Sequence, residues 1–394
     1  MNVLLISLFG FSESGRSAKI AFHTFKEDKV SVITSDFNHR KKSYYDGTEK
    51  FSSVIPQFLH VLPYKRNLSV KRLISHLSFA HALKKYLNSL SEVPDLVYCA
   101  MPASSGAYIA GKYCKKHNIP FVIDVIDLWP DSLIPIVPFK RIINICLFPW
   151  RHITKKAYRL ASYISGESKK YSDIAHKENL NVPYSYTYIG VESNKVELLL
   201  DSSSIILNKP KDEIWIGYGG SLGQSYDFDI ILQGMKYLTQ QGVKYKMWFI
   251  GDGEKADYIR TYSQANGLNF EITGHLEYKD LLKYLSYCDI AINSFKPDTL
   301  VVHSYKFNDY VATGCYILNN LSGETSDMID EYGVGRNFDK DSFCTVLLET
   351  VKNMDNLKLT IKDNLNKLKQ DKLETSLIYS SLKKDICEKL AIDN

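Results

Sequence analysis

Lys306 and Asp309 are the side chains of this sequence best suited to hold a nucleoside diphosphate. They belong to a segment, Ser304-Tyr305-Lys306, that we expect to open a helix, where backbone N–H groups and the helix dipole favour an anion. Lys306 adds a full positive charge for phosphate. Asp309 lies three residues further on the same helix face, where a carboxylate suits ribose hydroxyls. The spacing therefore predicts a site in which Lys306 binds phosphate and Asp309 binds ribose.

Two glycine-containing turns follow predicted strands in the same half of the chain. Gly219-Gly220-Ser221-Leu222-Gly223 ends the first, and Gly251-Asp252-Gly253 ends the second. Glycine lacks the Cβ that would keep the backbone away from an anion, so N–H groups of such turns approach phosphates closely. Doubly wound sheets bind ligands at this carboxyl edge. Simple turns without a ligand remain the alternative for both.

Three carboxylates cluster in the sequence Asp-Val-Ile-Asp-Leu-Trp-Pro-Asp, which closes a predicted strand in the first half. Asp124 and Asp127 lie on the strand, and Asp131 follows the Trp-Pro turn. One of them could orient an acceptor hydroxyl or act as a base, and we favour Asp127, with Asp131 second. Capping of a following helix is the alternative for Asp131.

The loop after the first predicted strand, Gly10 to Ser17, nearly matches the phosphate-cradling pattern G-x-x-x-x-G-K-S. Arg16 stands in the lysine position, and its planar guanidinium reproduces a compact ammonium poorly. A nucleoside-triphosphate hydrolase is thus an alternative whose weak point is Arg16.

Alternating strand-like and helix-like segments must position these residues. The pattern predicts strands at 2–8, 30–34, 58–62, 95–100, 120–127, 161–165 and 184–189 and then, after an expected linker around 190–210, at 214–218, 246–250, 270–272, 289–294 and 316–319. Helical patterns lie between these strands, and those at 64–85 and 139–158 are basic and amphipathic. The pattern also predicts helix throughout residues 339–391. Such alternation predicts parallel sheets and an α/β, doubly wound fold.

Length and composition agree with two cored domains. A chain of 394 residues with 45% apolar and 24% charged side chains exceeds the usual single-domain size. Its seven cysteines are scattered without a C-x-x-C pair, which is typical of a reduced, cytoplasmic protein. No apolar run has the roughly 18 residues that a transmembrane helix needs. We therefore expect a cytoplasmic protein without a metal site.

The chain also resembles a known family along nearly its whole length. Ser304 to Gly314 is similar to the P-x-K-x-x-E-Y-x-A-x-G motif of retaining GT-B glycosyltransferases of the large family-4 type, with Asp309 in the glutamate place. The D-L-W-P-D sequence is similar to that of capsule and O-antigen transferases of the N-acetyl-L-fucosamine-transferase type. The resemblance implies two Rossmann-like domains facing a cleft. We expect them at 1–195 (acceptor) and 196–372 (nucleotide-sugar), with a C-terminal helix at 373–394 crossing back to the first.

The resemblance also implies roles for the residues above. A nucleotide-sugar donor would contact the second half, and a glycan acceptor the first; the family usually needs no cofactor or metal. Lys306 would neutralise the departing diphosphate, with Asp127 and then Asp131 as further catalytic candidates. The predicted donor-binding residues are Gly220, Ser221, Gly223, Gly251, Asp252, Gly253, His275, Ser304, Tyr305, Lys306 and Asp309. The predicted acceptor-side residues are Ser14, Gly15 and Arg16.

One departure from the family concerns its E-x7-E pair. Asp309 fills the second position, but Val301 occupies the first and cannot bond sugar hydroxyls. Asp298, three residues upstream, could substitute. A catalytically silent subunit that binds a partner transferase therefore stays open as an alternative, as does a sugar-nucleotide epimerase-like enzyme.

Charge is unevenly distributed between the halves. Residues 1–190 carry a net charge of +12 and the remainder −7. A basic first half favours an anionic membrane surface or an acidic ligand, with solvated lysines as the alternative. No nucleic-acid recognition motif is present. The expected partner is a lipid-linked saccharide acceptor at the inner membrane surface.

Overall fold

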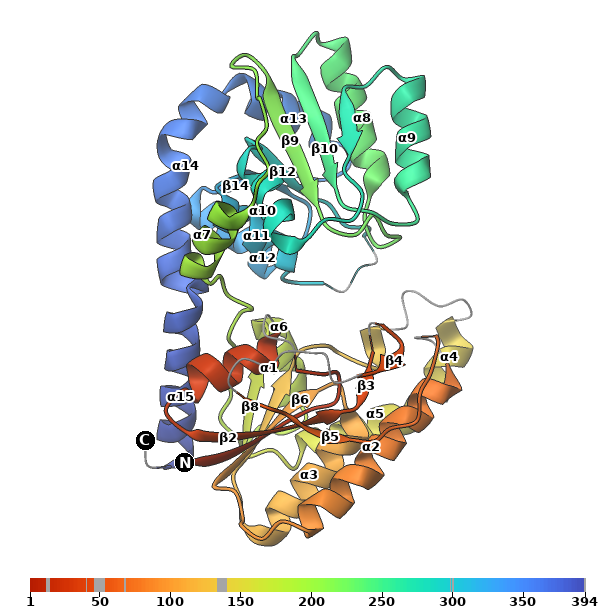
Figure 1. Cartoon of the computed structure of the whole chain (residues 1–394), viewed down its shortest axis with the longest axis vertical. Coiled ribbons are helices and arrows are strands. Elements are labelled where there is room, and N and C mark those ends of the chain that lie inside the picture. Colours follow the sequence, from red (N-terminus) through yellow and green to blue (C-terminus); the bar gives the residue numbers. More distant parts are fainter. Residues whose placement is uncertain are drawn as a thin grey trace. The chain divides into compact units, whose positions relative to one another are not determined.

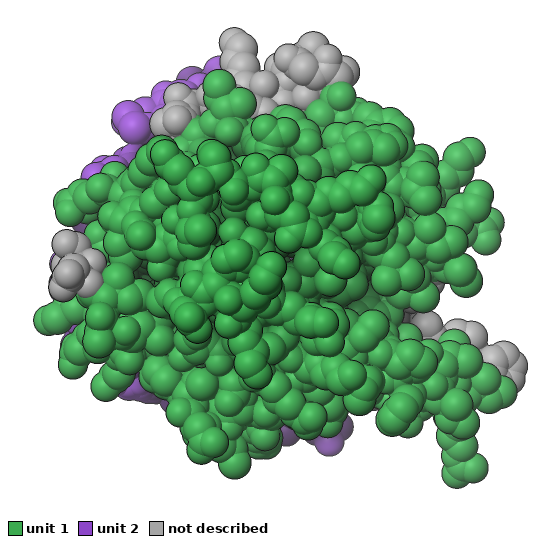
Figure 2. Space-filling view, turned by 90° about the horizontal axis from the view of Figure 1, so that it is seen from below, with its two compact units in different colours: residues 1–188, 375–394 green, residues 189–374 purple. Residues whose placement is uncertain are grey.

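The computed structural model describes residues 1–11, 15–39, 41–45, 54–66, 69–132, 140–297, 299 and 301–392. The chain divides into two compact units. Unit 1 comprises Met1–Tyr188 and Thr375–Asn394, and unit 2 comprises Ile189–Glu374. Figure 1 labels their elements, and Figure 2 colours the two units separately.

Unit 1 is built on a parallel six-stranded sheet with the order β5-β2-β1-β6-β7-β8. Its central strands are apolar on both faces, as expected where helices cover a parallel sheet on both sides. The strands are β1 (Asn2–Ser7), β2 (Lys29–Ser35), β5 (Gln57–Leu59), β6 (Leu96–Met101), β7 (Phe121–Val125) and β8 (Tyr163–Gly166); a short antiparallel pair, β3 (Phe37–Asn38) and β4 (Ser43–Tyr44), is separate.

The helices of unit 1 connect these strands. They are α1 (Arg16–Lys19) with the π-helical turn η1 (Ile20–Thr24), α2 (Val70–Asn88), α3 (Ser104–His117), α4 (Lys140–Cys146), α5 (Phe148–Tyr158), α6 (Lys169–His176) and α15 (Thr375–Leu390). We expected one helix over 139–158. The structure instead separates α4 from α5 at Leu147, because Pro149 lies in the first turn of α5, where proline can begin a helix but not continue one.

Unit 2 repeats the plan with a second parallel sheet in the order β11-β10-β9-β12-β13-β14. The strands are β9 (Ile214–Gly219), β10 (Tyr245–Ile250), β11 (Phe270–Ile272), β12 (Ile290–Asn293), β13 (Tyr316–Asn319) and β14 (Gly335–Asn337). The helices are α7 (Ser193–Ser202), α8 (Phe228–Gln240), α9 (Ala256–Ala265), α10 (Tyr278–Ser286), α11 (Tyr305–Thr313), α12 (Glu324–Tyr332), α13 (Phe343–Lys352) and α14 (Met354–Leu368).

The predicted α/β, doubly wound class is therefore confirmed in both units. The irregular linker expected around 190–210 is wrong in part, because the 10-residue helix α7 lies within it. Since all six strands of unit 2 run parallel, the ends of β9, β10 and β12 meet at one edge of the sheet. The loops that leave these ends carry most of the predicted donor-binding residues.

The C-terminal segment passes from α14 through the π-helical turn η3 (Lys369–Leu373) into α15, which is part of unit 1. Tyr379, Leu382 and Ile386 are buried there in one cluster with strand residues such as Val3 and Leu5. The last helix thus completes one face of the first sheet, and its apolar side chains belong to the core of unit 1.

Shortening a buried side chain of α15 should destabilise unit 1. Ile386 is fully buried, so Ile386→Ala should lower the free energy of unfolding by about 2–5 kcal/mol through lost burial and a residual cavity. Leu377→Ala on the same helix is the control: Leu377 is 51% exposed, so its loss should cost under about 0.5 kcal/mol. Urea denaturation followed by circular dichroism measures both; equal effects would show that α15 is not packed as described.

Candidate functional site

Two glycine loops of unit 2 contact each other through their backbones. The N–H of Gly220, after β9, donates to the Ile250 carbonyl at 2.8 Å, and the N–H of Leu222 donates to the Asp252 carbonyl at 2.9 Å. A Cβ on Gly251 would lie 2.0 Å from the Gly220 oxygen, and one on Gly253 would lie 2.6 Å from the Leu222 oxygen. The glycines of the second loop are therefore required by this packing.

Lys306 ends at the first of these loops. The side chain leaves the first turn of α11, which Ser304 caps by accepting a hydrogen bond from the Phe307 N–H at 3.2 Å. Its Nζ donates to the Gly219 carbonyl and lies 4.4 Å and 4.5 Å from the ring centroids of Tyr218 and Tyr226. A Cβ on Gly220 would lie 2.3 Å from this Nζ. Glycine at position 220 therefore makes room for the ammonium group.

Burial sets the charge state of Lys306. Removal from water lowers its pKa from 10.5 to about 7, although the carboxylate of Asp309 acts in the opposite direction. The two tyrosine rings present their negative faces to the cation. Near neutral pH the side chain is therefore close to half-protonated, and an arriving anion would favour the charged form.

Asp309 is held by a neighbouring helix. Tyr278, the first residue of α10, donates from its hydroxyl to Asp309 at 2.6 Å, and the pKa of Tyr278 is raised by burial and by this carboxylate. The cap residue Ser304 in turn donates to the Asn293 side chain at 3.1 Å, at the end of β12. The beginning of α11 is thus fixed from two directions.

The remaining predicted donor residues of unit 2 lie around these loops. Ser221, Asp252, His275 and Tyr305 are exposed, while Gly223 is partly buried. The side chain of Asp252 accepts from the Gly253 N–H at 2.7 Å, so it stabilises its own turn. Val301 is partly exposed, and Asp298 lies outside the described residues.

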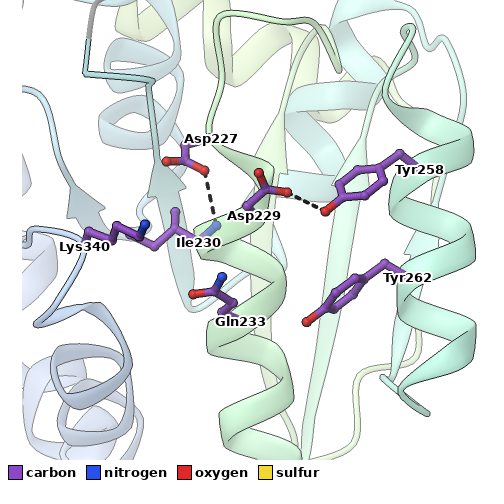
Figure 3. Close-up of a pocket in the computed structure, with 7 residues that line it drawn as sticks. All are labelled: Asp227, Asp229, Ile230, Gln233, Tyr258, Tyr262 and Lys340. Carbon is purple, nitrogen blue, oxygen red and sulfur yellow. Dashed lines mark hydrogen bonds between the residues drawn. The ribbon is translucent and has the colours of Figure 1, made fainter.

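A pocket of about 230 Å³ lies beyond the same β9 loop, between α8 and α9 (Figure 3). Asp227 caps α8 by accepting from the Ile230 N–H at 3.3 Å, and Asp229 accepts from the Tyr258 hydroxyl at 2.5 Å. The pocket is lined by Asp227, Asp229, Ile230, Gln233, Tyr258, Tyr262 and Lys340. The sequence reasoning singled out none of them, because their carboxylates read as ordinary helix-start residues.

In unit 1 the structure places Arg16 inside the protein. Its guanidinium donates twice to the Asp124 carboxylate, both times at 2.8 Å, and also to the Thr187 carbonyl. Burial alone would lower the pKa of Arg16, but Asp124, together with Tyr379 and Tyr98, outweighs burial and raises the pKa. Arg16 is only 4% exposed, which is at odds with our expectation that it faces an acceptor and with a phosphate-binding P-loop role. Gly15 precedes α1, and Ser14 lies outside the described residues.

The two predicted catalytic aspartates of unit 1 differ in environment. Burial raises the pKa of Asp127, against the opposing backbone N–H of Leu128 and the charge of Arg72. Asp131 instead forms an ion pair with Arg151, and its side chain is 55% exposed. Asp127 is thus the better placed of the two for acid–base chemistry. Asp131 is engaged in its ion pair with Arg151 of α5.

Sequence reasoning missed a polar and aromatic group beside Asp127. The Arg72 guanidinium lies 3.5 Å from the Trp129 ring centroid and 5.3 Å from that of Phe9. His76 stacks on Trp129 at 6.2 Å, and burial together with Arg72 lowers its pKa to about 3, so it is neutral. The helical pattern of α2 gave no sign that Arg72 and His76 face inward.

Glu167 was missed as well. It follows β8 at the same sheet edge as Asp127, and its N–H donates to the Val125 carbonyl at 3.0 Å. Burial raises the pKa of Glu167 to about 7; Arg16 opposes this rise, while Asp124 and Asp127 add to it. A carboxyl group with such a pKa could exchange a proton near neutral pH. Only the alternation of strands could have indicated Glu167, because it predicts that β8 ends beside β7 at the same edge of the sheet.

Comparison with known proteins defines the fold. Residues 201–295 match the family model described as glycosyl transferases group 1. No curated protein matches the sequence. HepE from Anabaena, in complex with UDP, aligns with a TM-score of 0.67 and 12% identity over 98% of this chain and 100% of its own. The fold is GT-B.

Two further solved structures agree. The lipopolysaccharide outer core galactosyltransferase WaaB, in its apo form, aligns with a TM-score of 0.65 and 15% identity over 99% of this chain and 100% of its own. The E. coli trehalose-6-phosphate structure bound with UDP-2-fluoro glucose aligns with a TM-score of 0.65 and 11% identity, covering 98% of both chains. In the part of the GT-B chain that the structure describes, no cluster of three or more metal-ligating side chains is present, and no helix is long and apolar enough to span a membrane.

Breaking the buried ion pair should be costly. Arg16→Met leaves the buried Asp124 carboxylate without its cation and should lower the free energy of unfolding by about 3–5 kcal/mol. Adding Asp124→Leu removes that charge, so the double variant should regain most of the loss. Urea denaturation tests this; a single variant as stable as wild type would contradict the described pair.

Alanine at Gly251 should disrupt the contact between the glycine loops. Gly251→Ala forces a Cβ against the Gly220 oxygen, whereas Gly242 also has positive φ, +68°, but nothing within 4 Å of its Cβ position. Gly242→Ala therefore carries only the backbone strain of about 1–3 kcal/mol, and Gly251→Ala should lose clearly more. Thermal unfolding of both variants compares them; equal losses would mean that the loops do not touch.

Proposed function

We propose that this protein is a retaining glycosyltransferase of the hexosyltransferase type, which moves a sugar from a nucleotide-diphosphate donor to a lipid-linked glycan. The observation that carries the proposal is that the Lys306 ammonium, from α11, lies against the glycine loop at the carboxyl edge of the sheet of unit 2, one helical turn from Asp309. The family match over residues 201–295 supports it independently, because that segment contains both glycine loops.

Unit 2 would hold the donor. The diphosphate would lie against the backbone N–H groups of Ser221 and Gly223 and pair with the Lys306 ammonium, while Asp309 would accept from ribose hydroxyls. Leaving-group charge develops on the diphosphate as the sugar departs, so a cation fixed beside it stabilises the transition state more than the ground state. No metal ion or further cofactor takes part in this proposal.

Unit 1 would hold the acceptor. Asp127, with its raised pKa, would orient or deprotonate the acceptor hydroxyl. Arg72, stacked on Trp129, would favour the charged form of the Asp127 carboxyl group. The net charge of +12 in residues 1–190 favours a lipid-linked, phosphate-bearing acceptor at the cytoplasmic face of a membrane, as in bacterial capsule or O-antigen synthesis.

A catalytically silent subunit is the second candidate. Val301 occupies the place where the resemblance implies a carboxylate, and a valine cannot accept a hydrogen bond from a sugar hydroxyl. Such a subunit would bind nucleotide without turning it over, and it would act through a partner transferase.

Turnover with nucleotide sugars separates these candidates. Wild-type protein with a matching donor and a lipid-linked acceptor should release nucleoside diphosphate and form a product that keeps the donor's anomeric configuration by NMR. Lys306→Met should lower kcat roughly 100- to 1,000-fold. Lys236→Met, which removes an exposed lysine from α8, is the control and should leave kcat unchanged.

Three results would count against transfer with retention. Nucleotide binding without product would favour the silent subunit. Loss of donor without acceptor, by conversion to an isomer, would favour an epimerase. A product of inverted configuration would contradict the retaining mechanism.

A further inference from the structure

The first half of α2 has its apolar residues on the outside. Val70, Leu73, Ile74 and Leu77 follow the i, i+3, i+4, i+7 spacing of one helix face, and all are between 38 and 71% exposed. Arg72, Ser75 and His76, which point the other way, are at least 92% buried. This is the reverse of a helix that packs its apolar face on a core.

The inward side chains of Arg72 and His76 pack against aromatic rings of unit 1, while Ser75 Oγ and His76 Nε2 are buried without a hydrogen-bond partner among the described residues. His76 lies among the rings of Phe9, Trp129 and Trp150, with centroid distances of 5.4 to 6.2 Å, and Arg72 lies over Trp129. None of the four outward apolar side chains belongs to a core cluster of the described residues. An exposed stripe of this length indicates a surface that is covered when the protein works.

Helix α4 presents a second set of exposed apolar side chains. Ile142 and Ile145 are 62% and 74% exposed, and Phe148, which opens α5, is 66% exposed. Trp150 in the first turn of α5 contacts His76 of α2 edge-on at 5.6 Å. In Figure 1, α4 correspondingly lies beside one end of α2. We call the exposed residues of α2 and α4, with Phe148, the α2–α4 face.

The segments that carry this face are rich in bases. Residues 51–91 contain six Lys or Arg and no Asp or Glu, and residues 132–166 again contain six and none. Three bases of the second segment pair with acids outside it: Arg151 with Asp131, and Lys155 and Arg159 with Glu178. Lys71 and Arg141 adjoin the stripe and are exposed. Apolar side chains flanked by exposed bases such as Lys71 and Arg141 fit the boundary between acyl chains and anionic headgroups. A protein interface would more often carry both signs of charge, arranged to match its partner.

We propose that the α2–α4 face docks unit 1 on an anionic lipid bilayer, with the apolar stripe entering the headgroup region and the bases contacting lipid phosphates. The inference deepens the proposed function, on which it rests for the lipid-linked nature of the acceptor. Docking itself needs neither donor nor turnover. It would bring the membrane surface to the helix whose inner side carries Arg72 and His76, next to Asp127.

Vesicle sedimentation of the full-length protein tests the proposal. Wild type should bind vesicles of phosphatidylcholine containing about a third phosphatidylglycerol, and it should bind pure phosphatidylcholine far more weakly, with binding that falls as salt rises. Leu73→Gln/Leu77→Gln and Ile142→Gln/Ile145→Gln should each lower the partition coefficient at least roughly tenfold. Lys71→Ser/Arg141→Ser should lower it roughly fivefold per charge removed.

The matched control is Ile206→Gln/Leu359→Gln in unit 2, whose side chains are 84% and 78% exposed. It should bind vesicles like wild type. Circular dichroism shows whether each variant is folded. Absence of wild-type binding to anionic vesicles, or equal binding by the stripe variants, would overturn the proposal. So would a stripe-dependent dimer in analytical ultracentrifugation that does not bind lipid.

The readout is separate from that of the proposed function. Vesicle binding is measured without nucleotide, and donor turnover with a water-soluble acceptor analogue is measured without vesicles. Lipid binding without turnover would leave docking intact and count against the transferase. Turnover without lipid binding would support the transferase and count against docking.

Discussion

Close backbone contact between the loops after β9 and β10 is the constraint on which the site of unit 2 depends. The Gly220 and Leu222 N–H groups bond to the second loop, and no Cβ fits at Gly251 or Gly253. This contact presents the Gly219 carbonyl to Lys306. In place of water, the Lys306 ammonium contacts this carbonyl and two tyrosine rings. A lysine held this way has a lowered pKa, because burial disfavours its charged form. A bound anion would favour that charged form again.

The first unit uses the corresponding edge of its sheet differently. There Arg16 forms a buried ion pair with Asp124, so the two side chains contribute to structure. Asp127 and Glu167 remain at the ends of β7 and β8 with raised pKa values, and Asp127 lies close to Arg72 on α2. One unit thus offers a cation at its sheet edge, and the other offers carboxyl groups.

Much of the fold could be predicted from the sequence, because parallel strands buried on both faces leave apolar runs separated by helical patterns. The start of α11 could also be predicted, since a serine cap, a lysine and an aspartate are local features. Which way Arg16 points could not, because its partner Asp124 is 108 residues away. The inversion of α2 was missed for a similar reason: an apolar stripe usually marks the core side, and only the contacts of His76 and Arg72 show that here it does not.

The most direct test of the Lys306 assignment is calorimetry of nucleoside diphosphate binding at about pH 8, in buffers of different ionisation enthalpy. With a ligand-free pKa of about 7, Lys306 is mostly neutral at that pH, and a bound diphosphate should raise its pKa. Binding should therefore take up close to one proton in the wild type, and Lys306→Met should bind more weakly without that uptake. Binding of the same affinity and the same proton balance in both proteins, or no diphosphate binding at all, would contradict the account.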